Sequence, residues 1–85
     1  MVIKVLGSAC TNCKRLEALV HEVTLEMGVE ATIEKVTDVM EMMSYRILGL
    51  PGLVIDGKVV CAGRVPSKTE LTTWLTDAMM AAPPA

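Results

Sequence analysis

Phenylalanine is absent from this 85-residue sequence, and one tyrosine and one tryptophan are its only aromatic residues. Cysteine is also scarce, with three residues, which excludes a small secreted scaffold held together by several disulfides. A core therefore has to be built from aliphatic side chains, with the seven methionines as adaptable filler.

An excess of charge of one sign is missing too. Eight basic and ten acidic residues leave a net charge of -2, so there is no basic surface for a nucleic acid, and we expect no such partner. No apolar run approaches the roughly 18 residues of a transmembrane helix, and the N-terminus lacks the basic and apolar segments of a signal peptide. We therefore expect no membrane association and a cytoplasmic location.

What is present is typical of a globular domain. Hydrophobic residues make up 52% of the chain and charged residues 21%, which argues against disorder. Because no linker divides the sequence, we expect one domain over residues 1–80. Residues 81–85, which include two prolines, are expected to form a flexible tail.

The first half of the chain alternates between strand and helix patterns. Val2 to Leu6 is apolar and β-branched and predicts a strand. From Cys13 to Met27 the apolar residues recur at the spacing of one helix face, and Gly28 is a typical helix end. Val29 to Val36 is closest to strand alternation. The segment from Asp38 to about Tyr45 or Ile47 fits a short capped helix.

The second half predicts a hairpin and a helix. Leu53 to Ile55 and Lys58 to Cys61 surround Asp56-Gly57, a strong signal for a type I′ turn. Ser67-Lys68-Thr69-Glu70 matches a capping box and predicts a helix that continues to about Met79. The predicted order is β-α-β-α-β-β-α. Strands joined by a helix lie parallel and hairpin strands lie antiparallel, so we expect an α/β fold with a mixed four-stranded sheet flanked by helices.

Two of the cysteines form a C-x-x-C pair between the first strand and the first helix. Cys10 lies at or just before the helix N-terminus, where unpaired N–H groups and the helix dipole favour a thiolate. Cys13 lies about one turn further on the same side and can close a small disulfide with Cys10. We predict that Cys10 attacks disulfides and that Cys13, the more buried thiol, resolves the mixed disulfide.

Two other functions use the same cysteine pair differently. Metal-carrying domains also place C-x-x-C between a first strand and a first helix, and two thiolates can bind Cu(I). Such domains close with a terminal strand, whereas this chain ends in a predicted helix, so the order of elements favours redox chemistry over a metal site. In the third alternative the chain is an interaction domain and its cysteines are incidental.

At the cysteine pair and two later segments, the chain resembles the thioredoxin-like superfamily. It is most similar to the small, glutaredoxin-sized redox-active disulfide proteins of the archaeal type, and the resemblance covers nearly all of residues 2–80. It rests on Gly7 to Lys14, Leu50 to Val60 and Ala62 to Ser67. The resemblance implies a thioredoxin-like fold and thiol–disulfide oxidoreductase or electron-carrier activity.

The resemblance also implies a substrate site around the cysteines. Pro51 is the implied cis-proline, which packs against the disulfide and leaves the preceding backbone at Leu50 free to pair with a substrate chain. We expect Thr11 and Asn12, between the cysteines, to contact the substrate as well. The chain departs from thioredoxin in having Leu50 where Thr or Val is frequent, no Trp before Cys10, and no Gly-Pro between the cysteines.

The expected partners follow from this chemistry. They are proteins that contain disulfides, and a separate reductase or small thiol that supplies electrons, because the sequence carries no flavin or nicotinamide fingerprint. We expect no cofactor, no bound metal and a monomeric protein.

The remaining chemistry-bearing residues have simpler interpretations. Cys61 is expected to act as a small buried apolar side chain in the fourth strand, and the alternative is a third redox thiol or an intermolecular disulfide. The methionines of the short helix, Met40, Met42 and Met43, are expected to fill the core rather than form a docking surface. Trp74 is expected to anchor the last helix on the sheet.

Overall fold

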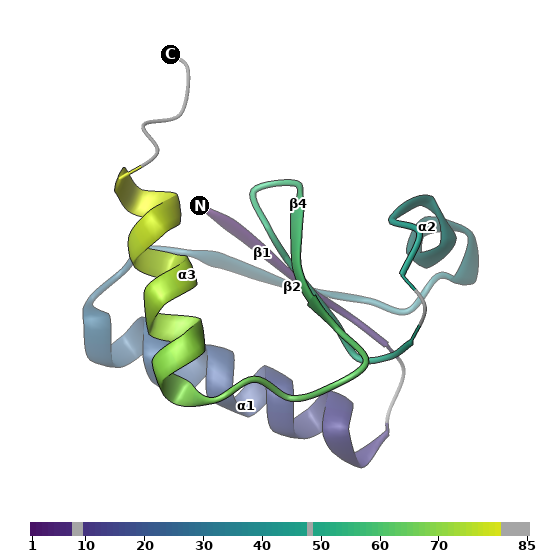
Figure 1. The fold of residues 1–85 in the computed structure, drawn as a ribbon, viewed down its shortest axis with the longest axis horizontal. Helices are drawn as coiled ribbons and strands as arrows, with labels where there is room; N and C mark the ends of the chain where they lie inside the picture. Colours follow the sequence, from purple (N-terminus) through teal and green to yellow (C-terminus); the bar gives the residue numbers. More distant parts are fainter. Residues whose placement is uncertain (8–9, 48, 81–85) are drawn as a thin grey trace.

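Four strands form one mixed sheet. The computed structural model describes residues 1–7, 10–47 and 49–80. The sheet has the order β2-β1-β3-β4, with β1 parallel to β2 and antiparallel to β3, and β3 antiparallel to β4 (Figure 1). Its strands are β1 (Val2–Leu6), β2 (Thr32–Val36), β3 (Gly52–Ile55) and β4 (Lys58–Ala62).

Three helices connect or follow these strands, and the predicted order of elements is confirmed. They are α1 (Thr11–Met27), α2 (Val39–Ser44) and α3 (Lys68–Met80). β2 begins later than the alternation indicated, at Thr32 rather than Val29. The reason is the end of α1: Gly28 is left-handed, its N–H bonds to the Leu25 carbonyl, and the Val29 N–H bonds to the Thr24 carbonyl.

The hairpin between β3 and β4 has the predicted turn. Asp56 and Gly57 have φ angles of 48° and 84°, the positive values that a type I′ turn requires at both central positions. The Asp56 carboxylate also accepts a hydrogen bond from the Val2 N–H at 2.7 Å. The turn is therefore tied to the first residue of β1.

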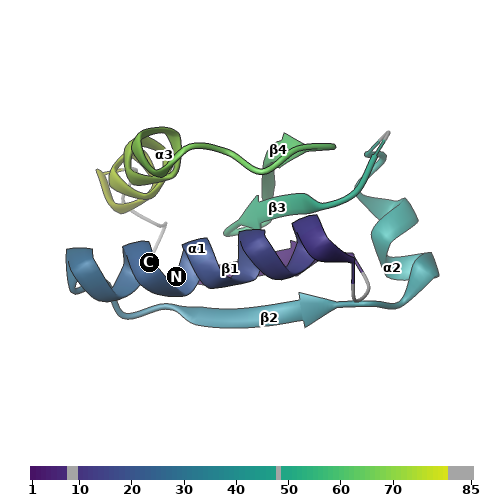
Figure 2. The same cartoon turned by 90° about the horizontal axis from the view of Figure 1, so that it is seen from below.

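Helices α1 and α3 lie on the same face of the sheet. In Figure 2, α1 runs across this face and α3 lies beside it. The core between helices and sheet contains no side chain larger than leucine or isoleucine among its buried members, as the scarcity of aromatics requires: Ile3, Val5, Leu16, Val20, Val23, Leu53, Ile55, Cys61, Leu71 and Leu75. Trp74 is partly buried against this cluster, as expected.

The other face of the sheet carries a smaller cluster that α2 covers. Leu6, Val36 and Val54 are buried there, and Met42 packs against them. The expectation that all three methionines fill the core is wrong for the other two, because Met40 is 75% and Met43 is 66% exposed. Met43 and Met40 lie one and two positions from Met42, so they do not share its side of the helix.

α3 begins with the capping box predicted from the sequence. The Ser67 hydroxyl accepts from the Glu70 N–H at 3.1 Å, and the Glu70 carboxylate accepts from the Ser67 N–H at 3.0 Å. The predicted flexible tail, residues 81–85, lies outside the described residues.

Candidate functional site

The two cysteines of the C-x-x-C pair lie at the start of α1 and form a disulfide. Cys10 and Cys13 are bonded through their sulfurs, with their Cα atoms 5.1 Å apart. Cys10 is the N-cap residue of α1, with extended backbone, and its carbonyl accepts from the Lys14 N–H at 3.0 Å. α1 therefore begins at Thr11, earlier than the apolar pattern alone indicated.

The environments of the two sulfurs differ. The Cys10 sulfur accepts a hydrogen bond from the Cys13 N–H at 3.0 Å, one of the donors that a helix N-terminus leaves without a partner. Cys10 is exposed, whereas Cys13 is 1% exposed. A thiolate at Cys10 would be both accessible to a partner and stabilised by the helix, and Cys13 is reachable from within the protein.

Gly7, Cys13 and Pro51 meet beneath the disulfide. A Cβ atom built on Gly7 would lie 2.5 Å from the Cys13 sulfur and 3.9 Å from the Pro51 Cα. Gly7 is buried and has a φ of 142°, a region that residues with a side chain rarely adopt. Only glycine therefore lets the end of β1 approach both groups.

Pro51 and Leu50 lie at the start of β3. The bond between them is cis, Pro51 is buried, and Leu50 is 47% exposed. The Pro51 carbonyl accepts from the Gly63 N–H at 2.9 Å. The backbone before β3 is thus held on one side by the protein itself.

The other predicted contact residues and the lysine of β1 are also placed. Thr11 and Asn12 are exposed in the first turn of α1, next to Cys10.

Lys4 is bound to α2 and to its C-cap residue. Its Nζ donates to the Tyr45 hydroxyl at 3.3 Å and to Glu41 at 3.4 Å, and these bonds raise the pKa of Lys4. Cys61 is buried in the core on β4.

The comparisons with known proteins agree with this site. A family model described as a thioredoxin domain matches residues 1–76. The chain belongs to this thioredoxin-domain family. The thioredoxin of Methanothermobacter thermautotrophicus is 37% identical over 71 residues, which cover 84% of this chain and 92% of that protein. The thioredoxin of Methanocaldococcus jannaschii is 34% identical over 71 residues, covering 84% of this chain and 81% of that protein.

Family membership and the cysteine pair at the start of α1 give the activity. The protein is a thiol–disulfide oxidoreductase. Within the part of the chain that the structure describes, no three His, Cys, Asp or Glu side chains come together as a group that could hold a metal ion. None of the helices described has the length and apolar character needed to cross a membrane.

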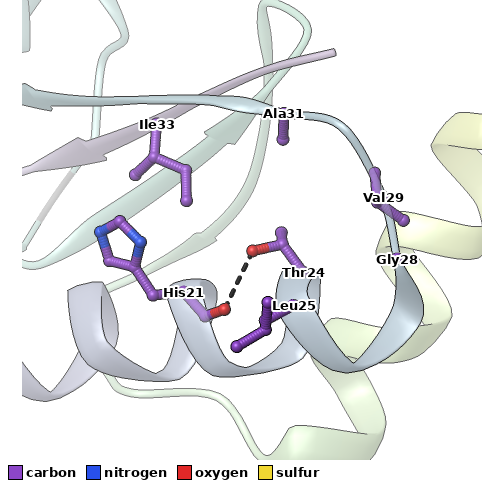
Figure 3. A pocket seen from close by; sticks show the side chains of 7 residues that line it. All are labelled: His21, Thr24, Leu25, Gly28, Val29, Ala31 and Ile33. Carbon is purple, nitrogen blue, oxygen red and sulfur yellow. Dashed lines mark hydrogen bonds between the residues drawn. The ribbon is translucent and has the colours of Figure 1, made fainter.

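A shallow pocket of about 440 Å³ lies away from the dithiol. Figure 3 shows its lining, which comes from the C-terminal part of α1, the segment that leads into β2, and Ile33 of β2 itself. The dashed bond there joins the Thr24 hydroxyl to the His21 carbonyl, at 3.1 Å. The pocket contains none of the predicted site residues, and it is not part of the redox site.

Sequence reasoning placed the cysteines at a helix start but did not find the contact between Gly7 and Cys13 or the bonds between Arg64 and Glu70. Gly7 was named only as the first residue of a segment that carries the family resemblance, and its close approach to the Cys13 sulfur was not predicted. Arg64 was part of the segment that carries the family resemblance, but its distance from the cysteines in sequence gave no indication of what it contacts.

Proposed function

We propose that Cys10 is the nucleophile and Cys13 the resolving thiol of this oxidoreductase. The observation that carries this assignment is the asymmetry of the pair, with an exposed Cys10 sulfur that accepts the Cys13 N–H and a Cys13 that is 1% exposed. A hydrogen bond and a helix N-terminus favour the thiolate form of Cys10. Burial leaves Cys13 accessible to Cys10 and closed to a bulky substrate.

The reaction consists of two thiol–disulfide exchanges. In the reduced protein, the Cys10 thiolate attacks one sulfur of a substrate disulfide, forms a mixed disulfide and releases the other substrate sulfur as a thiolate. The Cys13 thiol then loses its proton and attacks the Cys10 sulfur, which releases the second substrate thiolate. The substrate has gained two electrons and takes up two protons, and the protein is left with the Cys10–Cys13 disulfide.

Substrates on this proposal are proteins with accessible disulfides. We expect a substrate chain to pair with the backbone of Leu50 and Pro51. We expect it also to contact Thr11 and Asn12, which are exposed in the first turn of α1. A separate reductase or small thiol returns the disulfide to the dithiol. We place the protein in the cytoplasm, as a monomer with one domain over residues 1–80, where a reducing pool can supply electrons.

The order of the two thiols is tested by trapping the mixed disulfide. A Cys13→Ser variant, reduced and then mixed with a disulfide-bonded protein, is expected to accumulate a covalent complex through Cys10 that dithiothreitol releases. The Cys10→Ser variant is expected to form none. The Cys13→Ser, Cys61→Ser double variant is the matched control and is expected to trap the same complex as Cys13→Ser, because Cys61 is buried. Trapping through Cys13 in the Cys10→Ser variant, at the rate seen for Cys10, would reverse the assignment.

A further inference from the structure

The segment that joins β4 to α3 lies directly beside the backbone before β3. The Gly63 N–H donates to the Pro51 carbonyl at 2.9 Å. A Cβ atom built on Gly49 would lie 3.3 Å from the Gly63 Cα, so these two backbones are in close contact. The Gly63 backbone is therefore in direct contact with the segment that holds Leu50 and Pro51.

Gly63 is a poor anchor by itself. Its φ of 81° is open to glycine and disfavoured for other residues, and it is exposed. The strand before Gly63 is β4, an edge strand of the sheet, and β4 pairs with β3 on one side only. The position of Gly63 therefore depends on how the neighbouring residues of the segment are held.

Arg64, the next residue, is fixed by two parallel hydrogen bonds. Its guanidinium donates to the two carboxylate oxygens of Glu70 at 2.9 and 2.7 Å, the bidentate geometry that only arginine offers. The same carboxylate accepts from the Ser67 N–H. One side chain thus holds both the beginning of the segment and the start of α3.

The pair stays charged over the whole range in which thiol chemistry is measured. The bonds from Arg64 and from the Ser67 N–H lower the pKa of Glu70 to about 2, and the bond to Glu70 raises the pKa of Arg64.

The Arg64 carbonyl also accepts from the Cys61 thiol at 3.6 Å. The backbone of Arg64 is therefore attached to the core on one side, and its side chain to α3 on the other.

We propose that Arg64 is a positioning residue for protein substrates, through its bidentate bond to Glu70. The bond holds Gly63 against Pro51 and so keeps the Leu50–Pro51 backbone in place for pairing with a substrate chain. The proposal rests on the proposed function, since it concerns the same site. The loss of Arg64 should affect substrate binding and not the thiol–disulfide exchange itself. The reason is that Arg64 is connected to the site through Gly63 and Pro51, and not through the cysteines.

A direct role for the charge of Arg64 would behave differently. If the guanidinium attracted acidic groups of the substrate, Glu70→Gln would free its charge and improve binding, and Arg64→Lys would preserve binding. If the bidentate bond positions the backbone, Glu70→Gln, Arg64→Lys and Arg64→Ala all weaken binding, since each removes the two-bond geometry.

The test compares a large and a small disulfide. Insulin serves as the protein substrate and hydroxyethyl disulfide, which has no peptide backbone, as the small one. For Arg64→Ala and Glu70→Gln we expect KM for insulin to rise about threefold to tenfold, with kcat and the rate with hydroxyethyl disulfide unchanged. If Arg64→Ala folds poorly, Arg64→Lys, the mildest change, takes its place in the comparison. It is expected to raise KM for insulin as well.

Lys68→Ala is the matched control. Lys68 lies on α3, as Glu70 does, and makes an exposed ion pair at 2.8 Å with Glu26 of α1. None of its described bonds reaches Gly63 or Pro51, so KM for insulin should stay at the wild-type value. The proposal is overturned if the Arg64 and Glu70 variants match Lys68→Ala, or if they lose activity equally with both substrates. Failure of the wild-type protein to reduce either disulfide would instead refute the proposed function.

Discussion

Gly7 lies where the end of β1, the Cys13 sulfur and Pro51 meet. Replacing it with alanine puts a Cβ 2.5 Å from the Cys13 sulfur. In the dithiol this sulfur can turn away, but in the disulfide it is fixed by Cys10, so the clash destabilises the oxidised form more. Overpacking of about 1–3 kcal/mol corresponds to a reduction midpoint about 20 to 60 mV less negative, measured in a graded thiol–disulfide buffer.

The control for this variant is Gly28→Ala. Gly28 also has a positive φ, of 66°, but a Cβ there meets nothing within 4 Å. This variant should lose about 1–2 kcal/mol of stability from backbone strain and keep the wild-type midpoint. Equal midpoints for Gly7→Ala and Gly28→Ala would show that the contact between Gly7 and Cys13 has no effect on the disulfide.

Cys61 is the third thiol and belongs to the core. It is 7% exposed and donates to the Arg64 carbonyl. In a Cys10→Ser, Cys13→Ser variant, we expect Cys61 to resist alkylation in the native protein and to react fully in denaturant, measured by mass. Rapid native labelling would show that Cys61 is a reactive thiol and would contradict its role as a buried apolar side chain.

At the scale of the elements, the stability that the start of α3 adds to the fold depends on pH. The pKa of Glu70 is lowered from 4.5 to about 2, first by Arg64 and then by Ser67. A carboxylate with a lowered folded pKa adds stability that is present above its unfolded pKa and lost as the pH falls through the folded one. This contribution should therefore be constant above about pH 5 and disappear toward about pH 2.

The measurement is the thermal midpoint of the wild type and of Glu70→Gln over this pH range. Because every other carboxyl group is shared, the difference between the two midpoints isolates Glu70. We expect a wild-type advantage at neutral pH that shrinks as the pH falls from about 5 to about 2. A difference that stays the same over the whole range would contradict the pairing of Glu70 with Arg64.

Elements with local signals were predictable from the sequence. The Asp56-Gly57 turn and the Ser67 capping box each depend on neighbours in the chain, and both are present. The start of β2 was not predictable, because Gly28 and Val29 bond back to α1 rather than to the sheet. Met40 and Met43 were misjudged because the prediction used composition and not helical spacing: with Met42 turned inward, residues one and two positions away face other sides of α2.

At the scale of the whole molecule, the site is the place where three distant segments come together. The cysteine pair could be found from the sequence because both thiols lie on one turn of one helix. Gly7, Pro51 and Gly63 meet there only because β1 and β3 are neighbours in the sheet and β4 returns beside β3. Family resemblance supplied Pro51, whereas the contacts of Gly7 and Arg64 needed the folded arrangement.

The central claim is that Cys10 and Cys13 form a reversible dithiol–disulfide couple. The most direct test is to equilibrate the metal-free protein across a graded thiol–disulfide buffer and to read the state of the pair by alkylation and mass. We predict a single reversible two-electron transition between the dithiol and the Cys10–Cys13 disulfide. Failure to form this intramolecular disulfide under oxidising conditions would contradict the account and favour metal binding by the same thiols.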